Sequence, residues 1–106
     1  MTQFVLIYFG GGMPESEAEQ AKVMQAWGDW YTELGSAVVD AGNPFTPVAK
    51  SIASNGTMRD GPVGPMPTGY TILEADSLDQ AVQMAQGCPM LKGGGEVTVL
   101  ETFPAM

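Results

Sequence analysis

The sequence predicts a single α+β domain, residues 1–106, in which two helices cover one face of a sheet. Three observations predict it. The chain has 106 residues, 44% of them hydrophobic; short apolar stretches alternate with two amphipathic stretches of helical period; and no repeat or linker divides the chain. A chain of this length forms one small core that additional partner surface would stabilise. The expected order is strand, helix, strand, hairpin, strand, helix, strand, which two layers can accommodate.

Residues 4–9, with the sequence FVLIYF, form the first expected strand. They are apolar at every position, which is typical of a strand that is covered on both faces. The two expected helices cover only one face of the sheet. We therefore expect a second copy of the chain to bury the other face in an isologous dimer. The strand residues expected to face that copy are Val5, Ile7, Leu73 and Val99.

Gly10 to Gly12 follow this strand, at the place where a phosphate-binding turn would lie. The chain lacks a third glycine at the dinucleotide-binding spacing, and it lacks the Gly-Lys-Ser/Thr of a phosphate loop. The acidic residues that follow are Glu15, Glu17 and Glu19. Their charge would repel a phosphate but complements the positive end of a helix dipole. We expect a turn here and no phosphate site.

The first helix is expected from residue 14 or 15 to residue 34, and Gly35 provides a stop. Its apolar stripe consists of Val23, Met24, Trp27, Trp30, Tyr31 and Leu34. The simpler interpretation places the aromatic residues in the core, and the alternative places them along a ligand cleft between helix and sheet. Gly28 inside the helix costs about 1 kcal/mol relative to alanine, which suggests close approach to another backbone.

A short strand is expected at residues 37–39, followed by a loop. Residues 50–54 and 57–60 flank Asn55-Gly56, and this pair favours a hairpin with a type I′ turn. Residues 61–69 are too rich in proline and glycine for regular structure. This segment either connects two strands or covers a cleft, and we favour the connector.

A central strand at residues 70–75 leads into the second helix. Ser77 and Gln80 have the spacing of a capping box, in which each side chain satisfies a backbone donor of the other residue. Gly87 is expected to end this helix in the left-handed conformation, because Pro89 cannot continue it. After a turn at residues 92–95, residues 96–103 alternate as a half-buried strand.

Three features together resemble one family. They are the segment GYTILEADSLDQAVQMAQGCP at residues 69–89, Asp60-Gly61-Pro62 upstream, and the helix that carries Trp27 and Trp30. The chain resembles the YCII-related family, in its branch marked by a DGPF motif, over residues 4–101. Val63 stands where that branch usually has Phe. The resemblance implies a dimeric α+β barrel of ferredoxin-like order with an antiparallel sheet, found in mostly bacterial proteins of unknown function, some of them near or fused to sigma-factor-like regulators.

The resemblance also implies where catalytic groups would stand. Members closer to the founding type carry a His on the first helix and an Asp before a proline after the second helix, proposed as an acid/base pair. Aligned by Gly35 and Pro89, this chain has Met24 and Cys88 at those positions. Neither residue can do that work, and the chain contains no His. We therefore expect no catalytic residue of that kind.

Charge and composition exclude several classes of function. The 12 acidic and 4 basic residues give a net charge of −8, which opposes binding to nucleic acid or to anionic membranes. With no His and one Cys, we expect no metal site and no cofactor. A single Cys excludes an internal disulfide, and no stretch has the pattern of a signal peptide or a membrane span, so we expect the cytoplasm.

Eight residues are candidates for a ligand cleft: Tyr8, Met24, Trp27, Tyr31, Arg59, Asp60, Tyr70 and Cys88. Each also has a structural interpretation. Cys88 is expected to be buried and inert rather than reactive. Arg59 is expected to pair with Asp60 or another surface acid rather than hold a carboxylate ligand. We expect a non-enzymatic homodimer that binds a small organic molecule or a regulatory protein, and the alternative is a small-metabolite enzyme that uses Tyr, Asp and Arg groups.

Overall fold

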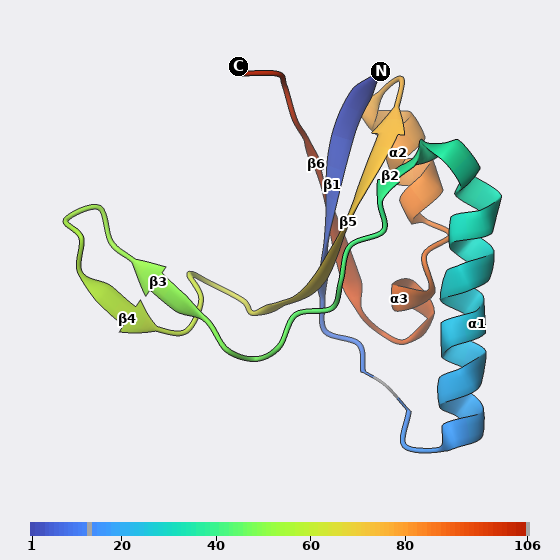
Figure 1. Cartoon of the computed structure of the whole chain (residues 1–106), viewed down its shortest axis with the longest axis horizontal. Coiled ribbons are helices and arrows are strands. Elements are labelled where there is room, and N and C mark those ends of the chain that lie inside the picture. Colours follow the sequence, from blue (N-terminus) through green and yellow to red (C-terminus); the bar gives the residue numbers. More distant parts are fainter. Residues whose placement is uncertain (13, 106) are drawn as a thin grey trace.

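The structure is a computed structural model that describes residues 1–12 and 14–105. Its helices and strands follow the predicted order, with two short helices added (Figure 1). In chain order the elements are β1 (Thr2–Phe9), α1 (Glu17–Leu34), the 3-10 helix η1 (Gly35–Ala37), β2 (Val38–Asp40), β3 (Lys50–Ile52), β4 (Met58–Asp60), β5 (Pro67–Ala75), α2 (Leu78–Ala85), α3 (Pro89–Lys92) and β6 (Glu96–Glu101). The α+β fold class is thus confirmed.

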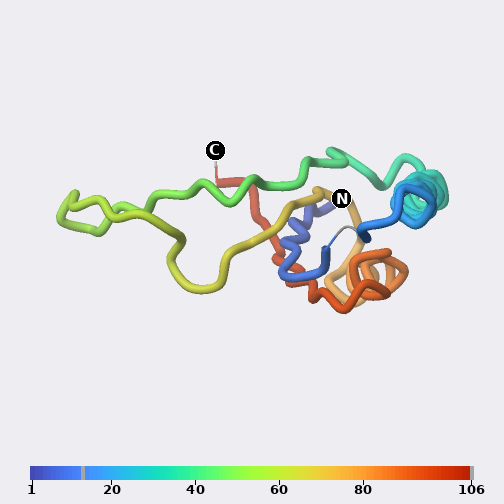
Figure 2. Tube along the Cα trace, turned by 90° about the horizontal axis from the view of Figure 1, so that it is seen from below, coloured from blue at the N-terminus to red at the C-terminus, as the bar shows by residue number. Residues whose placement is uncertain are grey.

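Four strands form one antiparallel sheet in the order β2-β5-β1-β6. The longest pairing joins β1 to β5, from Thr2 opposite Ala75 to Tyr8 opposite Gly69. Figure 2 shows α1 and α2 on one side of this sheet, while the β3–β4 hairpin extends from the other side. The two helices therefore cover a single face, as predicted.

The core lies between the sheet and the helices. Alternate residues of β1 and β5 point into it and are fully buried or nearly so: they are Phe4, Leu6, Tyr8, Thr71, Leu73 and Ala75. Val97 and Val99 of β6 pack against the same core. The expectation that Leu73 and Val99 face a partner sheet is wrong, because their place in the strand alternation directs them towards the helices.

The other face of the sheet is apolar and uncovered within one protomer. We call it the open face; its apolar residues are Val5, Ile7, Phe9, Tyr70, Ile72 and Leu100, and the strand register places Gln3, Glu74, Glu96 and Thr98 beside them. Val5 lies opposite Ile72 on β5 and Leu100 on β6, so one apolar row crosses three strands. These side chains are only half-buried, in contrast to their neighbours on the helix face.

α1 begins two or three residues later than predicted, because Ser16 caps it. The Ser16 hydroxyl accepts a hydrogen bond from the Glu19 backbone N–H at 3.1 Å. The helix ends at Gly35, which has a φ of 58° as expected of a stop. Among the described residues, and apart from the backbone of α1 itself, no heavy atom lies within 4 Å of the Cβ position at Gly28. The expectation that Gly28 admits another backbone is therefore wrong.

α2 has the predicted cap at Ser77, whose hydroxyl accepts from the Gln80 N–H at 3.1 Å. The Gln80 side chain reaches back to the backbone N–H of Asp76 rather than to that of Ser77. Gly87 does not adopt the predicted left-handed conformation. Instead, Gly87 lies against the Trp30 ring, which a Cβ atom would meet at the ordinary contact distance of 3.4 Å. Pro89 then opens α3, which the sequence did not predict.

The hairpin is confirmed, but its turn differs from the prediction. A type I′ turn needs positive φ at both central residues, and only Gly56 has it, with a φ of 89°. The Ala53 N–H donates to the Thr57 carbonyl at 2.7 Å, which leaves a three-residue loop that ends in the left-handed Gly56. We call residues 45–66, which contain this hairpin, the arm, and we call the remainder of the chain the body.

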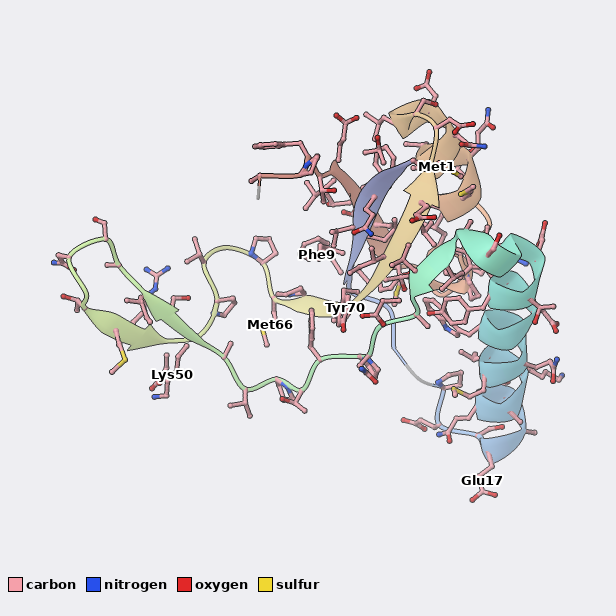
Figure 3. All side chains as sticks on the ribbon, turned by 45° about the horizontal axis from the view of Figure 1, so that its top comes forward. Met1, Phe9, Glu17, Lys50, Met66 and Tyr70 are labelled. Atoms are coloured by element: carbon pink, nitrogen blue, oxygen red, sulfur yellow. The ribbon has the colours of Figure 1, made fainter. Side chains whose placement is uncertain are left out.

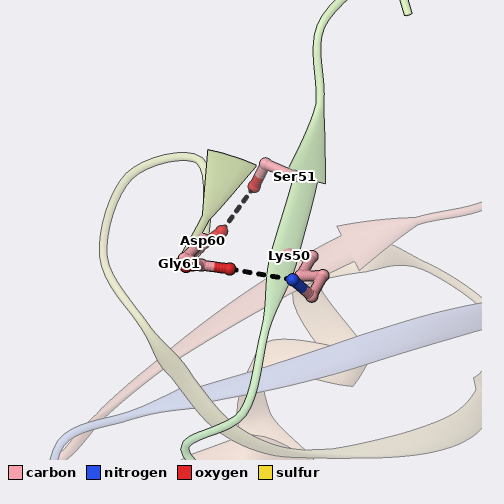
Figure 4. A network of polar contacts seen from close by, with 4 residues as sticks. All are labelled: Lys50, Ser51, Asp60 and Gly61. Carbon is pink, nitrogen blue, oxygen red and sulfur yellow. Dashed lines mark hydrogen bonds and ion pairs between the residues drawn. The ribbon is translucent and has the colours of Figure 1, made fainter. Parts of the chain in front are cut away.

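Polar contacts hold the two sides of the arm together near its base (Figure 4). Lys50 Nζ lies 2.9 Å from Asp60 Oδ1, and Ser51 Oγ donates to the Gly61 carbonyl at 2.7 Å. The Gly61 N–H donates to the Ala49 carbonyl at 2.9 Å, and its φ of 94° favours glycine. The Asp60-Gly61-Pro62 segment therefore closes the open end of the β3–β4 hairpin.

Candidate functional site

Three hydroxyl groups and one thiol converge between α1 and the sheet. We call Tyr8, Tyr31, Thr71 and Cys88 the hydroxyl cluster. Tyr8 Oη donates to Thr71 Oγ1 at 2.7 Å, and Thr71 Oγ1 donates to the Ala41 carbonyl at 3.0 Å. Tyr31 Oη donates to the same carbonyl at 3.1 Å and lies 3.3 Å from Thr71 Oγ1. The cluster thus joins β1, β5, α1 and the segment after β2.

The strand register explains why Tyr8 and Thr71 meet. Tyr8 lies opposite Gly69, and Thr71 follows two residues later on the same face, so the two side chains are diagonal neighbours. A Cβ atom at Gly69 would lie 3.5 Å from the Tyr8 ring and 3.2 Å from the Asn43 carbonyl. Gly69 therefore leaves room for both the ring and the chain that leads to the arm.

Aromatic side chains of α1 close this region. The Trp27 ring meets the Tyr8 ring edge-on, with centroids 5.3 Å apart and planes at 76°. Trp30 packs edge-on to Trp27 at 5.7 Å, and its indole N–H donates to the Met84 carbonyl at 3.0 Å. Trp30 is only 4% exposed. These contacts favour the core interpretation of the aromatic stripe.

Burial keeps the ionisable groups of the cluster neutral. It raises the pKa of the Tyr8 hydroxyl far above its ordinary value, and the nearby Cys88 thiol adds to the rise. It also raises the pKa of Tyr31 and that of Cys88. Across the described residues, no buried side-chain nitrogen or oxygen lacks a hydrogen-bond partner. The cluster is therefore a satisfied, uncharged network, suited to holding elements together.

The structure brings together four of the eight predicted cleft residues, namely Tyr8, Trp27, Tyr31 and Cys88. Cys88 is buried, as expected, and it lies between the end of α2 and the start of α3. Thr71, the hub of the network, was not among the residues predicted for the site. A polar residue that alternates with Leu73 and Ala75 on the buried face of a strand is the signal that could have identified it.

The other four predicted residues lie elsewhere. Met24 is 62% exposed on α1, and Trp27, one turn later, is the residue over Tyr8. Arg59 and Asp60 are exposed on the arm. Tyr70 points to the open face, where its ring stacks on Phe45 with centroids 5.7 Å apart. Figure 3 shows this separation, with Lys50 on the arm and Tyr70 on the sheet.

Two surface hollows lie outside the cluster. One, of about 330 Å³, lies between α1 and α2, and we call it the α1–α2 hollow. Its lining residues are Trp30, Glu33, Leu34, Gln80, Gln83, Met84 and Gly87. The other, of about 290 Å³, lies at the base of the arm, and we call it the arm-base hollow. Its lining residues are Phe45, Thr46, Val48, Ala49, Lys50, Pro62, Met66 and Pro67.

Within residues 1–12 and 14–105, no group of three or more His, Cys, Asp or Glu side chains is placed to hold a metal ion. In the same part of the chain, no helix combines the length and the apolar character that crossing a membrane requires.

Comparison of the sequence with known families identifies the family of the chain. The chain matches the YCII-related domain over residues 4–104, almost its whole length. It belongs to the YCII-related family. The family resemblance seen in the sequence is thus confirmed, while the assignment to the DGPF branch stays a prediction.

This YCII-related chain also resembles a solved structure. That structure is the 5-chloro-2-hydroxyhydroquinone dehydrochlorinase TftG from Burkholderia phenoliruptrix, in complex with 2,5-dihydroxybenzoquinone. The TM-score is 0.55 and the sequence identity 19%, over 95% of this chain and 93% of that one. The likeness shows a shared fold. No curated protein is similar in sequence at a significant level.

Proposed function

We propose that this YCII-related chain is a non-enzymatic homodimeric module that binds a small organic molecule in the α1–α2 hollow. The observation that carries the proposal is the state of the hydroxyl cluster. Its hydroxyl groups are hydrogen-bonded to one another and to the Ala41 carbonyl, and its thiol is buried. Because their pKa values are raised, Tyr8, Tyr31 and Cys88 are protonated at neutral pH, and none of them can act as a general base. The cluster therefore suits a scaffold better than acid/base chemistry.

The α1–α2 hollow supports small-molecule binding through its size and lining. Its volume of about 330 Å³ falls at the lower end of the range for ligand pockets, roughly 300–1,000 Å³. Trp30, Leu34 and Met84 supply apolar surface, while the amides of Gln80 and Gln83 can donate and accept hydrogen bonds. Among the described residues that line it, Glu33 alone is charged. These groups suit a neutral or cationic ligand and disfavour an anion.

The open face supports the homodimer. It exposes an apolar row of Ile72, Val5 and Leu100 across three adjacent strands. A sheet face of this kind is stabilised by removing its apolar surface from water. A second copy packed face to face provides a surface of the same composition about 10 Å away, and an isologous arrangement buries both.

Ligand binding can be tested by NMR on the intact protein. A set of neutral and cationic ring compounds should shift backbone amide signals around Gln80, Gln83 and Glu33, and Gln83→Arg should abolish those shifts. Gln25→Arg is the matched control, because Gln25 is exposed on α1 and bonds only Asp29. Shifts that persist in Gln83→Arg would refute the hollow as the site. If the protein bound a regulatory protein but none of the small molecules, the proposal that its ligand is a small organic molecule would be refuted.

A second candidate function is an enzyme that acts on a small metabolite. It is favoured by the convergence of Tyr8, Tyr31 and Thr71 hydroxyls between helix and sheet, and by the fold shared with TftG. The predicted Arg59 and Asp60 would not contribute from within the same protomer, because they lie on the arm. Incubation with chlorinated hydroxyhydroquinones, followed by chloride release, tests this function. Turnover that Tyr8→Phe abolishes would establish it over the binding module.

A further inference from the structure

We infer that the arm of each protomer lies against the body of the other copy in the homodimer. This inference rests on the homodimer proposed above and specifies its geometry. Each copy would be held in two ways: by the open face, and by an arm that reaches past the partner's sheet to its helices. Three independent observations lead to this arrangement: the exposure of the arm, its direction and reach, and its charge.

The arm exposes apolar side chains along its length. Val48 is 82% exposed, Ile52 69%, Met58 66% and Val63 77%. In the described part of the chain, the hydrogen bonds of residues 48–61 are all internal to the arm. Contact with the body occurs at the base, where Phe45 stacks on Tyr70. An isolated two-stranded hairpin is marginally stable in water, so this one needs a covering surface.

The direction of the arm selects a second copy as that surface. In both Figure 1 and Figure 2 the arm leaves one end of the sheet on the side opposite α1 and α2. This is the side of the open face. The arm therefore projects from the edge of the open face at an angle to it. A second copy packed on the open face would contact both the sheet and the arm.

The reach of the arm identifies the level at which it would meet the partner. Layers of secondary structure pack about 10 Å apart, so the helix layers of a dimer with two facing sheets lie about 30 Å from each other. The longest axis of one protomer, along which the arm extends from the helices, measures 44 Å. The arm is thus long enough to pass the partner's sheet and to reach the partner's helices.

The distribution of charge complements this contact. Lys50, Arg59 and Asp60 give the arm a net charge of +1, whereas the body holds 11 of the 12 acidic residues but only 2 of the 4 basic ones, a net charge of −9. Lys50 pairs with Asp60, and among the described residues Arg59 has no acidic partner within ion-pair distance. A positive, apolar arm and a negative body attract each other when they come from different copies.

The arm-base hollow adds a place for a side chain of the second copy. Phe45, Val48, Pro62 and Met66 make its lining mainly apolar, and Lys50 lies at its rim. The hollow lies next to the open face, since Phe45 stacks on Tyr70 of that face. The arm and the open face therefore form one continuous apolar surface, which a single partner can cover.

Two sets of variants test the inference by analytical ultracentrifugation. Ile7→Lys changes the open face and should give monomer, as the proposed homodimer requires. Ile52→Ser combined with Met58→Ser changes only exposed side chains of the arm, and Arg59→Glu reverses its unpaired charge. Each should raise the dimer dissociation constant at least tenfold. Ser54→Ala changes an exposed side chain of the arm without removing apolar surface or charge, and it should leave the constant unchanged.

Cross-linking shows where the arm lies. A zero-length carboxyl–amine reagent is applied to dimers assembled from ¹⁴N- and ¹⁵N-labelled chains. Mixed-isotope peptides that join Lys50 to an acidic residue of the body are expected. A wild-type monomer would refute the homodimer itself. The arm contact alone would be overturned by a different set of results. In that case Ile7→Lys dissociates the dimer, the arm variants leave the dimer dissociation constant unchanged, and no mixed-isotope Lys50 peptide appears. The arm would then be assigned to contact with another protein.

Discussion

Removing the Thr71 hydroxyl is the most direct perturbation of the hydroxyl cluster. Thr71→Val keeps the shape of a fully buried side chain but deletes two hydrogen bonds, of 2.7 Å to Tyr8 and 3.0 Å to Ala41. Each bond contributes about 1 kcal/mol net. The Ala41 carbonyl keeps Tyr31 as a donor, but the buried Tyr8 hydroxyl loses its acceptor, which adds about 1 kcal/mol. We expect Thr71→Val to lower the free energy of unfolding by about 3 kcal/mol.

The double variant makes the reasoning testable. Tyr8→Phe alone removes one bond and should cost about 1 kcal/mol. In Tyr8→Phe/Thr71→Val no donor is left unpaired, so the expected cost is about 2 kcal/mol rather than the roughly 4 kcal/mol of additive effects. Urea unfolding followed by circular dichroism, at one fixed protein concentration, measures these changes. Thr32→Val, which removes an exposed hydroxyl that bonds the Gly28 carbonyl, is the control and should shift stability by less than about 0.5 kcal/mol. Additive costs in the double variant would refute the network.

Three further predictions follow from single residues. Gly28→Ala should raise the free energy of unfolding by about 1 kcal/mol, measured by urea unfolding, because no described atom outside the backbone of α1 lies within 4 Å of the added methyl group; a destabilised protein would contradict the open surroundings. Cys88 should react with a thiol reagent at pH 8 only as fast as the protein unfolds, because it is buried and burial raises its pKa; rapid stoichiometric labelling of the native protein would contradict this. The folded state raises the pKa of Cys88 and of Tyr8, so unfolded chains release these protons first. Stability should therefore fall as the pH rises above about 8.5 and again above about 10, and Tyr8→Phe should reduce the second fall.

The regular elements were predictable from the sequence because their signals are local. The apolar stripe of α1, the cap at Ser77, the continuous apolar run of β1 and the β-branched and aromatic residues of β5 are signals from residues a few positions apart. The end of α2 near Gly87 was predicted, but the left-handed conformation expected of Gly87 is not observed. Gly87 lies against the ring of Trp30, more than 50 positions earlier, and no local pattern indicates this contact.

The candidate site shows the same division. Tyr8, Trp27, Tyr31 and Cys88 were expected near one another because they lie on elements that face a common core. Arg59 and Asp60 were grouped with them because an arginine can hold a carboxylate ligand, and no sequence pattern showed how far residues 58–60 lie from the cleft. The direction of the arm depends on contacts between residues 41–45 and β5, and no short sequence pattern encodes these contacts.

The Ala41 carbonyl has a role beyond its hydrogen bonds. It precedes the segment from which the arm leaves the body, and Thr71 and Tyr31 both hold it. Gly42 follows with its backbone pressed against Tyr70, and the bridge between Pro44 and Gly69 fixes the next step. The hydroxyl groups of Thr71 and Tyr31 thus anchor the start of the arm to the core. Because the arm is long, a small rotation at this anchor would move its tip by a much larger distance. Related chains that change this anchor would keep the same fold yet direct their arms, and therefore their assemblies, differently.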